Sequence, residues 1–146
     1  MLTQILGKPV ILVIEDYRDS REMLKLILEN LGYRVLAAAN GDEALAMAVS
    51  NRVELILTDF GLPDMDGEGL VRRLRSLSER LRRTPIIMLT ALVGAEYYDR
   101  AISAGCTDVL AKPPDFEKLQ TMIKRLLLES GEDSKDTANG VQFRES

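Results

Sequence analysis

The stretch ELILTDFGLPDMDG, residues 54–67, runs from an apolar segment into a polar turn. Leu55, Ile56 and Leu57 are followed at once by Thr58 and Asp59, and the chain then enters residues that are typical of turns. One carboxylate at a strand end carries little information, because aspartate often starts a turn. The same arrangement recurs after other apolar segments of this chain, and the recurrence predicts both a fold and a site.

Five short apolar segments are separated by stretches of helical period. Each segment is almost continuously apolar, as parallel strands buried on both faces should be. The predicted strands are residues 10–14, 34–38, 54–58, 85–89 and 108–111. A helix after each strand implies right-handed crossovers. We therefore predict an α/β fold, a (βα)5 doubly wound parallel sheet of five strands in the flavodoxin-like order 2-1-3-4-5.

The predicted helices are marked by apolar stripes with a period near 3.6 residues. These stripes are Met23, Leu24, Ile27, Leu28 and Leu31; Ala44, Leu45, Ala48 and Val49; Leu70, Val71, Leu74 and Leu77; Tyr98, Ala101 and Ile102; and Phe116, Leu119, Ile123, Leu126 and Leu127. We expect Asp19, with Glu22 three residues later, to cap the first helix and Asp115 to cap the last. Residues 1–128 are predicted to form one domain, and residues 129–146 an acidic disordered tail.

The composition excludes several classes of function. The 146 residues include 46% hydrophobic and 29% charged ones, a balance typical of a soluble globular domain. The net charge of −4 argues against direct nucleic-acid or membrane binding. The chain has no histidine, which excludes Ser-His-Asp triads and most zinc sites, and its one cysteine, Cys106, fits a reducing, cytoplasmic setting.

Polar side chains follow four of the five predicted strands. In an open α/β sheet, ligands bind beyond the carboxyl ends of the strands, where the strand order reverses. Glu15, Asp16 and Asp59 should therefore meet there, with Thr90 and Lys112 on the far side. Two carboxylates about 5 Å apart repel by about 3 kcal/mol at an effective dielectric constant near 20. We expect Lys112 and Mg²⁺, a cation that prefers oxygen ligands, to offset this repulsion and make Asp59 a phosphoryl acceptor.

Residues 8–128 resemble the receiver domain of two-component response regulators. The matching segments are VILVIEDYRDSR, GYRVLAAANGDEAL, LILTDFGLPDMDG, PIIMLTA and AGCTDVLAKP. Each is weak alone, but their order and spacing are specific. The resemblance implies a signalling domain of the single-domain, chemotaxis-regulator-like kind that is phosphorylated by a histidine kinase or a histidine phosphotransfer protein and then binds a downstream protein. Such a domain catalyses only its own phosphorylation and slow dephosphorylation.

The resemblance also assigns roles to individual residues. It implies that Asp59 accepts the phosphoryl group and that Asp16, Asp59 and the carbonyl of Gly61 bind Mg²⁺, with Glu15 assisting through water. Thr90 and Lys112 would hold phosphoryl oxygens. Pro63 and Gly67 would shape the loop, and Pro113 would be the family's cis proline.

One position departs from the family pattern. Val109 stands where the family usually has tyrosine or phenylalanine. A pseudo-receiver that docks a partner constitutively therefore stays open as the alternative function. Two other functions fit less well: an aspartyl-phosphate phosphatase needs an aspartate at Gly61, and a flavodoxin-like FMN carrier would not have the acidic segment EDYRDS after its first strand.

A basic run lies on and after the third predicted helix. Its members are Arg72, Arg73, Arg75, Arg80, Arg82 and Arg83. A solvated face is the favoured interpretation over a docking patch. The chain is expected to be either a stand-alone regulator or a receiver from a longer protein.

Overall fold

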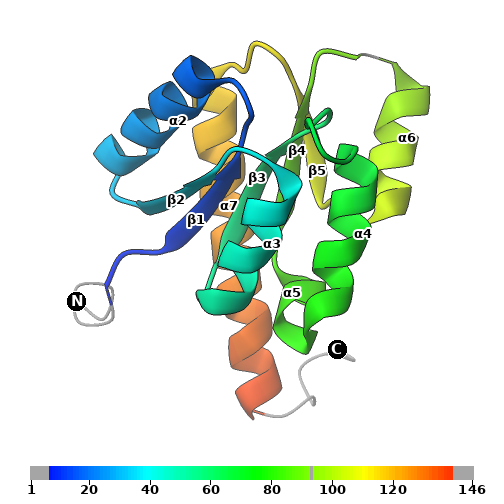
Figure 1. Ribbon diagram of the computed structural model, residues 1–146. Helices are drawn as coiled ribbons and strands as arrows, with labels where there is room; N and C mark the ends of the chain where they lie inside the picture. The colour runs from blue at the N-terminus through cyan, green and yellow to red at the C-terminus, as the bar shows by residue number, and fades with distance from the viewer. Residues whose placement is uncertain (1–6, 93, 140–146) are drawn as a thin grey trace.

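Five parallel strands form one sheet in the order β2-β1-β3-β4-β5 in the computed structural model, which describes residues 7–92 and 94–139 (Figure 1). The elements in chain order are β1 (Val10–Ile14), α2 (Arg18–Asn30), β2 (Arg34–Ala38), α3 (Gly41–Ser50), β3 (Leu55–Asp59), α4 (Gly67–Leu77), α5 (Glu79–Arg83), β4 (Ile86–Thr90), α6 (Ala95–Ala104), β5 (Asp108–Ala111) and α7 (Phe116–Asn139). The predicted fold and strand order are confirmed. No helix within the described ranges is both long and apolar enough to cross a bilayer.

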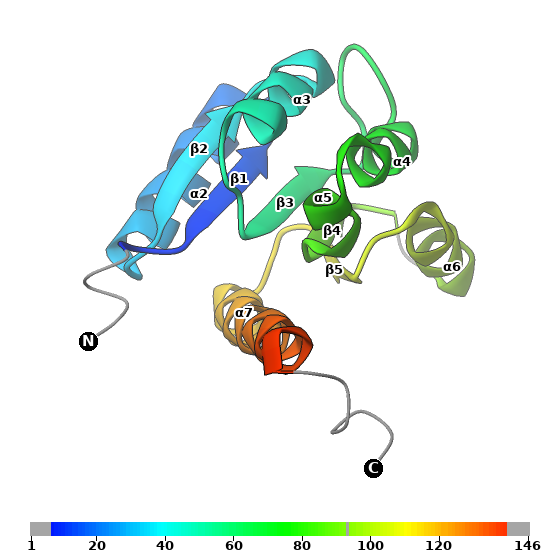
Figure 2. The same ribbon diagram turned by 90° about the horizontal axis from the view of Figure 1, so that it is seen from below.

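Helices cover both faces of the sheet, which explains the continuous apolar character of its strands. Helices α2 and α7 lie on one face, and α3, α4, α5 and α6 lie on the other (Figure 2). Neighbouring residues of β3 enter different clusters: Leu55 and Leu57 pack toward α2 and α7, whereas Ile56 packs toward α3 and α4. Every residue of β3 and of β4 is buried.

Two strands lie one residue later than predicted. The predictions 54–58 and 85–89 become Leu55–Asp59 and Ile86–Thr90. The ladder continues because the Phe60 amide donates to the Leu89 carbonyl at 3.1 Å and the Lys112 amide donates to the Thr90 carbonyl at 2.8 Å. Asp59 and Thr90 are therefore the last residues of their strands and are fixed by the sheet itself.

The predicted cap of α2 is wrong. The N-cap residue is Tyr17, which makes no side-chain capping bond, and Asp19 lies inside the first turn. The helix starts earlier because the Arg21 amide already donates to the Tyr17 carbonyl, at 2.9 Å. The predicted cap of α7 is confirmed, since an Asp115 oxygen accepts from the amides of Glu117 and Lys118.

The predicted stripes hold at their centres and fail at their margins. Leu24, Leu28, Leu70 and Leu74 are buried, as expected. Six members of the stripes are instead substantially exposed: Met23, Leu31, Val49, Leu77, Tyr98 and Phe116. Each helix packs on the sheet along a narrow line of contact, so the outer members of a broad stripe face solvent.

The last helix is longer than expected. Helix α7 continues to Asn139, beyond the predicted boundary at residue 128. Residues 140–146 lie outside the described residues. The domain boundary at residue 128 and the disordered tail after it stay predictions.

Arg75, a member of the basic run, is structural, and so the solvated-face interpretation is wrong for it. Arg75 is partly buried, and its guanidinium donates to the carbonyls of Gly105, Leu81 and Thr84, with Nη2 to Gly105 O at 2.7 Å and Nη1 to Leu81 O at 2.8 Å. Burial lowers the pKa of Arg75 from its usual value. The side chain thus joins α4, the short helix α5 and the turn before β5. The sequence pattern did not reveal α5, which has a single buried side chain, Leu81.

We expect Arg75→Ala to lower the free energy of unfolding by about 3 kcal/mol, because three carbonyls lose a charged donor. Urea unfolding followed by circular dichroism measures the change. Arg72→Ala is the matched control, since Arg72 is an exposed residue of the same helix, and it should change the free energy of unfolding by less than about 0.5 kcal/mol. Equal effects of the two changes would contradict the structural role.

Candidate functional site

Three carboxylates meet at the carboxyl edge of the sheet. Glu15 follows β1, Asp16 comes next in the chain, and Asp59 ends β3. One oxygen from each lies within 4.8 Å of the other two. Glu15 and Asp59 are 3% and 9% exposed, whereas Asp16 is exposed. The structure therefore brings the three predicted carboxylates together.

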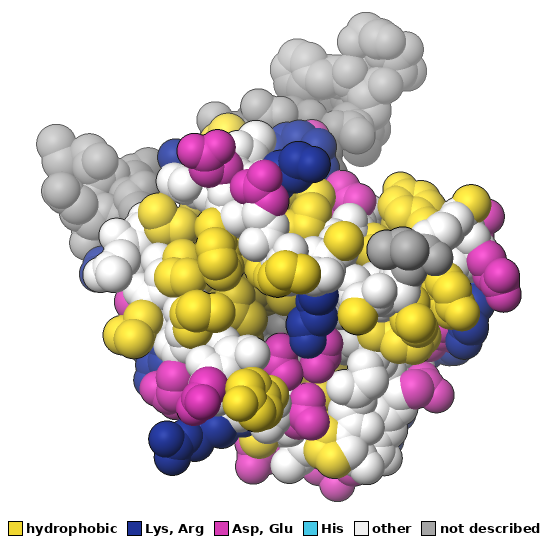
Figure 3. Space-filling model, turned by 90° about the horizontal axis from the view of Figure 1, so that it is seen from above, with side chains coloured by type: hydrophobic (Ala, Val, Ile, Leu, Met, Phe, Trp, Pro, Cys, Tyr) yellow, Lys and Arg dark blue, Asp and Glu magenta, His cyan; other side chains and the backbone are white. Residues whose placement is uncertain are grey.

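Lys112 supplies the positive charge of the cluster. Its Nζ lies 2.6 Å from Asp59 Oδ1 and 3.1 Å from Glu15 Oε1. The lysine follows β5, and the peptide bond to Pro113 is cis, as expected. Figure 3, which looks onto this end of the molecule, shows acidic side chains gathered beside a basic one, with hydrophobic side chains next to them.

The charges in the cluster are not balanced. Burial, with repulsion from Glu15, raises the pKa of Asp59 to about 6 even though Lys112 lowers it. Burial works against the Lys112 ammonium, but its hydrogen bonds to Asp59 and Glu15 outweigh that effect, and the pKa of Lys112 is raised. One ammonium among three carboxylates leaves excess negative charge. A set of oxygen donors with that charge fits a hard divalent cation such as Mg²⁺.

Thr90 lies at the same edge, one residue beyond the position that pairs with Asp59. Asp59 pairs with Leu89 in the sheet, and Thr90 is nearly fully buried. The Thr90 hydroxyl oxygen accepts a hydrogen bond from the Leu92 amide at 3.0 Å. The hydroxyl is thus bonded to the loop that leads into α6.

The loop between β3 and α4 is held tightly at both ends. A Cβ at Gly67 would lie 2.5 Å from the Phe60 carbonyl oxygen and 2.8 Å from that of Asp59, so only glycine permits this approach. Gly61, by contrast, has open space around it. Its predicted role as a metal ligand stays a prediction.

Asp64 is a residue of this loop that sequence reasoning missed. Its two carboxylate oxygens accept from the amides of Gly41 and Asp42 at 2.8 and 2.9 Å, and the bond from Gly41 contributes most to lowering the pKa of Asp64. The loop is therefore fixed to the first turn of α3. Asp64 is 23 residues from Gly41 in the sequence, so no local pattern could have revealed the contact.

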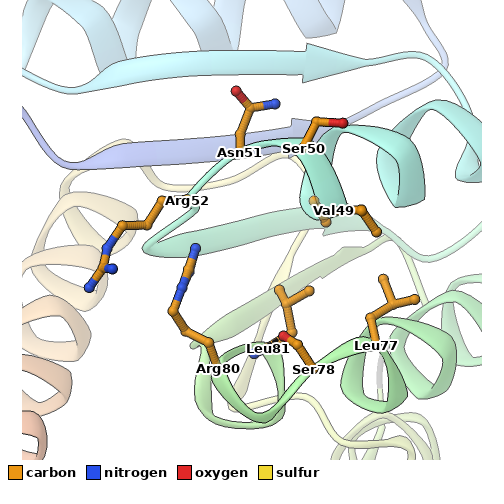
Figure 4. Close-up of a pocket in the computed structure, with 9 residues that line it drawn as sticks. Val49, Ser50, Asn51, Arg52, Leu77, Ser78, Arg80 and Leu81 are labelled. Atoms are coloured by element: carbon orange, nitrogen blue, oxygen red, sulfur yellow. Dashed lines mark hydrogen bonds between the residues drawn. The ribbon is translucent and has the colours of Figure 1, made fainter.

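One hollow on the described surface borders the carboxylates. This cavity of about 370 Å³ lies next to Glu15 and Lys112, and its apolar lining includes Met23, Pro113 and Phe116. Another cavity, of about 480 Å³, lies between the C-terminal end of α3 and helices α4 and α5 (Figure 4). Val49 and Leu77 line it from its two sides, at the amino end of the strands. It is therefore not part of the acidic site.

A comparison with known families identifies the chain. The family model for the response regulator receiver domain matches residues 11–124. The chain belongs to this family. The acidic cluster and Lys112 thus occur in a signalling domain.

The relatives are longer proteins or isolated receiver domains. The chain is 32% identical over 141 residues to the transcriptional regulatory protein ZraR of Salmonella typhimurium, covering 95% of this chain and 31% of ZraR. It is 37% identical over 118 residues to the transcriptional regulatory protein CrdR of Helicobacter pylori, covering 81% of this chain and 54% of CrdR. The chain thus spans about a third to half of these two relatives.

Solved structures agree with the fold at similar identity. The chemotaxis response regulator CheY4 of Vibrio cholerae has a TM-score of 0.77 and 32% identity, covering 82% of this chain and 99% of that one. The receiver domain of the sensor histidine kinase PA1611 of Pseudomonas aeruginosa has a TM-score of 0.76 and 36% identity, covering 83% and 98%. That receiver domain was solved with a magnesium ion in its active-site cleft.

We expect Asp59→Asn to remove a fall in stability of the metal-free protein between about pH 4 and pH 6. The pKa of Asp59 is about 6 in the fold against an ordinary 3.8, so the folded state holds the proton more tightly than the unfolded state. Stability is therefore higher when Asp59 is protonated and falls as the pH rises through this range, by about 3 kcal/mol. Urea unfolding with EDTA at pH 4 and pH 7.5 measures the fall.

Asp66→Asn is the control for this experiment. Asp66 is exposed, and its side chain caps α4 through the Gly69 amide, a role that asparagine can keep. This variant should retain the full fall in stability. The same pH dependence in wild type and Asp59→Asn would contradict the assignment of the raised pKa to Asp59.

Proposed function

We propose that Asp59 accepts a phosphoryl group from a phosphohistidine of a histidine kinase or histidine phosphotransfer protein, and that the modified domain then binds a downstream protein. The observation that carries the proposal is the pairing of Asp59 with Lys112 at 2.6 Å inside a cluster of three carboxylates. Membership in the receiver family supports it. The transcriptional relatives are longer than this chain, and so the downstream partner is proposed only by class.

The chemistry follows from the charges of the side chains. A carboxylate oxygen of Asp59 attacks phosphorus in line, the new P–O bond gives an acyl phosphate, and the P–N bond to the imidazole breaks. The departing imidazole nitrogen keeps the bonding electron pair and takes a proton. With a pKa of about 6, Asp59 is largely ionised at neutral pH and so available as the nucleophile. The Lys112 ammonium stabilises charge on the transferred oxygens.

The other site residues have supporting roles in the proposal. The side chains of Asp16 and Asp59 and the Gly61 carbonyl would hold Mg²⁺, with Glu15 assisting. When bound, the ion would neutralise negative charge on the phosphoryl oxygens and on the carboxylates. The Thr90 hydroxyl would leave the Leu92 amide to donate to a phosphoryl oxygen.

The phosphorylated state is proposed to turn over slowly. Hydrolysis of an acyl phosphate requires a water positioned in line, which a carboxylate or amide side chain near the phosphoryl group does best. Gly61 and Leu92, each two residues beyond a residue of the site, carry no such group. The domain would therefore act as a signalling element and catalyse only its own phosphorylation and slow dephosphorylation.

A constitutive docking module is the second candidate function. One observation favours it: Val109, at the position where the resemblance leads one to expect an aromatic residue, is half-buried and packs against the core cluster on the α3 side of the sheet. Valine has few side-chain conformers and cannot act as a large aromatic gate. The arrangement of charges around Asp59 favours the phosphoacceptor function over the docking module.

The decisive test is phosphorylation by a small-molecule donor. With acetyl phosphate and Mg²⁺, intact-mass spectrometry should find one added phosphoryl group on wild type and none on Asp59→Asn. Asp66→Asn, a change to an exposed aspartate seven residues away, should behave as wild type. An unmodified wild-type protein that also receives no phosphoryl group from any histidine kinase would support the docking module instead.

Magnesium should stabilise the folded protein, because it relieves the repulsion among the carboxylates and binds the folded site. At about 100 times its dissociation constant, one bound ion adds about 2.7 kcal/mol. Differential scanning fluorimetry with and without Mg²⁺ should show a rise in Tm that Asp16→Asn abolishes. The control is Asp19→Asn, three residues later in the chain and within α2, which should keep the Mg²⁺-dependent rise in Tm. An unchanged wild-type Tm would contradict the metal site.

A further inference from the structure

The first half of α6 is weakly packed. From Ala95 to Arg100 no residue is buried, and only Tyr97 is even half-buried. The helix packs through the small side chains of Ala101 and Ala104 further along. The N-cap residue, Gly94, has no side chain to cap the helix. This half of α6 therefore depends on few contacts, and those of Arg100 are among them.

Arg100 is attached to α4 by an ion pair. Its Nε lies 2.9 Å from Glu68 Oε2, and the Glu68 side chain is 12% exposed. Glu68 lies in the first turn of α4, directly after Gly67, the residue that contacts the Asp59 and Phe60 carbonyls. A carboxylate with little access to water interacts more strongly with its partner than a surface pair does.

The same guanidinium also lies over two aromatic rings. Its central carbon is 5.9 Å from the ring centroid of Phe60 and 5.8 Å from that of Tyr97, distances at which a cation is attracted to a ring face. Phe60 directly follows Asp59, and its amide donates a hydrogen bond to the Leu89 carbonyl of β4. Arg100 thus joins α6 to the residue next to the proposed phosphoryl acceptor.

The loop that leads into α6 is connected to the other side of the site. The Leu92 amide is bonded to the Thr90 hydroxyl oxygen. If that hydroxyl turns toward a phosphoryl group on Asp59, the bond breaks and the loop before α6 must rearrange. The Arg100 contacts oppose any movement of α6 that follows.

We propose that Arg100 is a latch that holds α6 in the arrangement belonging to unphosphorylated Asp59. We define the Arg100 latch as the contacts of Arg100 with Glu68, Phe60 and Tyr97. The proposal rests on the proposed function, because it concerns how α6 responds to a phosphoryl group. By linkage, a contact that stabilises one arrangement lowers the affinity for every ligand that binds the other arrangement. Removal of the latch therefore strengthens binding of a phosphoryl group or its mimic.

The test measures the affinity of the full chain for beryllofluoride, a phosphoryl mimic, at saturating Mg²⁺ by isothermal titration calorimetry. Arg100→Gln should bind about fivefold more tightly than wild type, within the range of ordinary couplings between sites. Glu68→Gln should act in the same direction. The double variant should bind no more tightly than Arg100→Gln alone, because both changes break one interaction.

Arg125→Gln is the matched control. Arg125 lies on α7 and is about as exposed as Arg100, at 52% against 50%. It also forms an ion pair with a partly buried carboxylate, that of Asp108 in β5. This variant should keep the wild-type affinity. Without Mg²⁺ or beryllofluoride, amide hydrogen exchange should accelerate at residues 95–100 in Arg100→Gln and not in Arg125→Gln.

The outcomes separate the latch from the proposed function. Unchanged or weaker beryllofluoride binding by Arg100→Gln, with normal binding by wild type, overturns the latch and leaves the proposed function intact, because a purely structural loss does not raise affinity. Failure of wild type to bind beryllofluoride overturns both. A lower Tm of Arg100→Gln without tighter binding also counts against the latch.

Discussion

The site depends on one partly buried ammonium that bonds to two carboxylates. Lys112 lies within hydrogen-bond distance of both Glu15 and Asp59, side chains that lie 97 and 53 residues away in the sequence. The parallel sheet makes this meeting possible, because it brings the carboxyl ends of β1, β3 and β5 to one edge. The arrangement is electrostatically incomplete, as the raised pKa of Asp59 indicates. A site built in this way has excess negative charge that a cation relieves and that chemistry at Asp59 changes.

The sequence predicts those features that repeat along the chain or rest on backbone geometry. Alternation of apolar and helical segments predicts the sheet and its order, and polar residues at strand ends predict the cluster of Glu15, Asp16 and Asp59. Side-chain contacts between distant segments were not predictable. Arg75 looked like one member of a basic run, and Asp64 looked like an ordinary loop residue, because their partners lie elsewhere in the sequence.

The errors at helix ends have a common physical origin. Asp19 is a good capping residue, but the N-cap of α2 is Tyr17, two residues earlier. A tertiary contact lies there, since Arg21 Nη1 donates to the Glu15 carbonyl at 2.9 Å. Burial at the margins of an apolar stripe is hard to predict for a similar reason. The helical period identifies the face of a helix that packs on the sheet, but it does not give the width of that contact. Tyr98 is 48% exposed although it continues the stripe of Ala101.

The double hydrogen bond that Asp64 accepts from α3 makes the two walls of the site unequal. One wall, the segment between β3 and α4, is clamped to α3 by Asp64 and to α4 by the close approach of Gly67. The opposite wall, between β4 and α6, has no such clamp among its described residues, and α6 begins there without a side-chain cap. A bulky group added at this edge would therefore displace the segment before α6 more easily than the segment before α4.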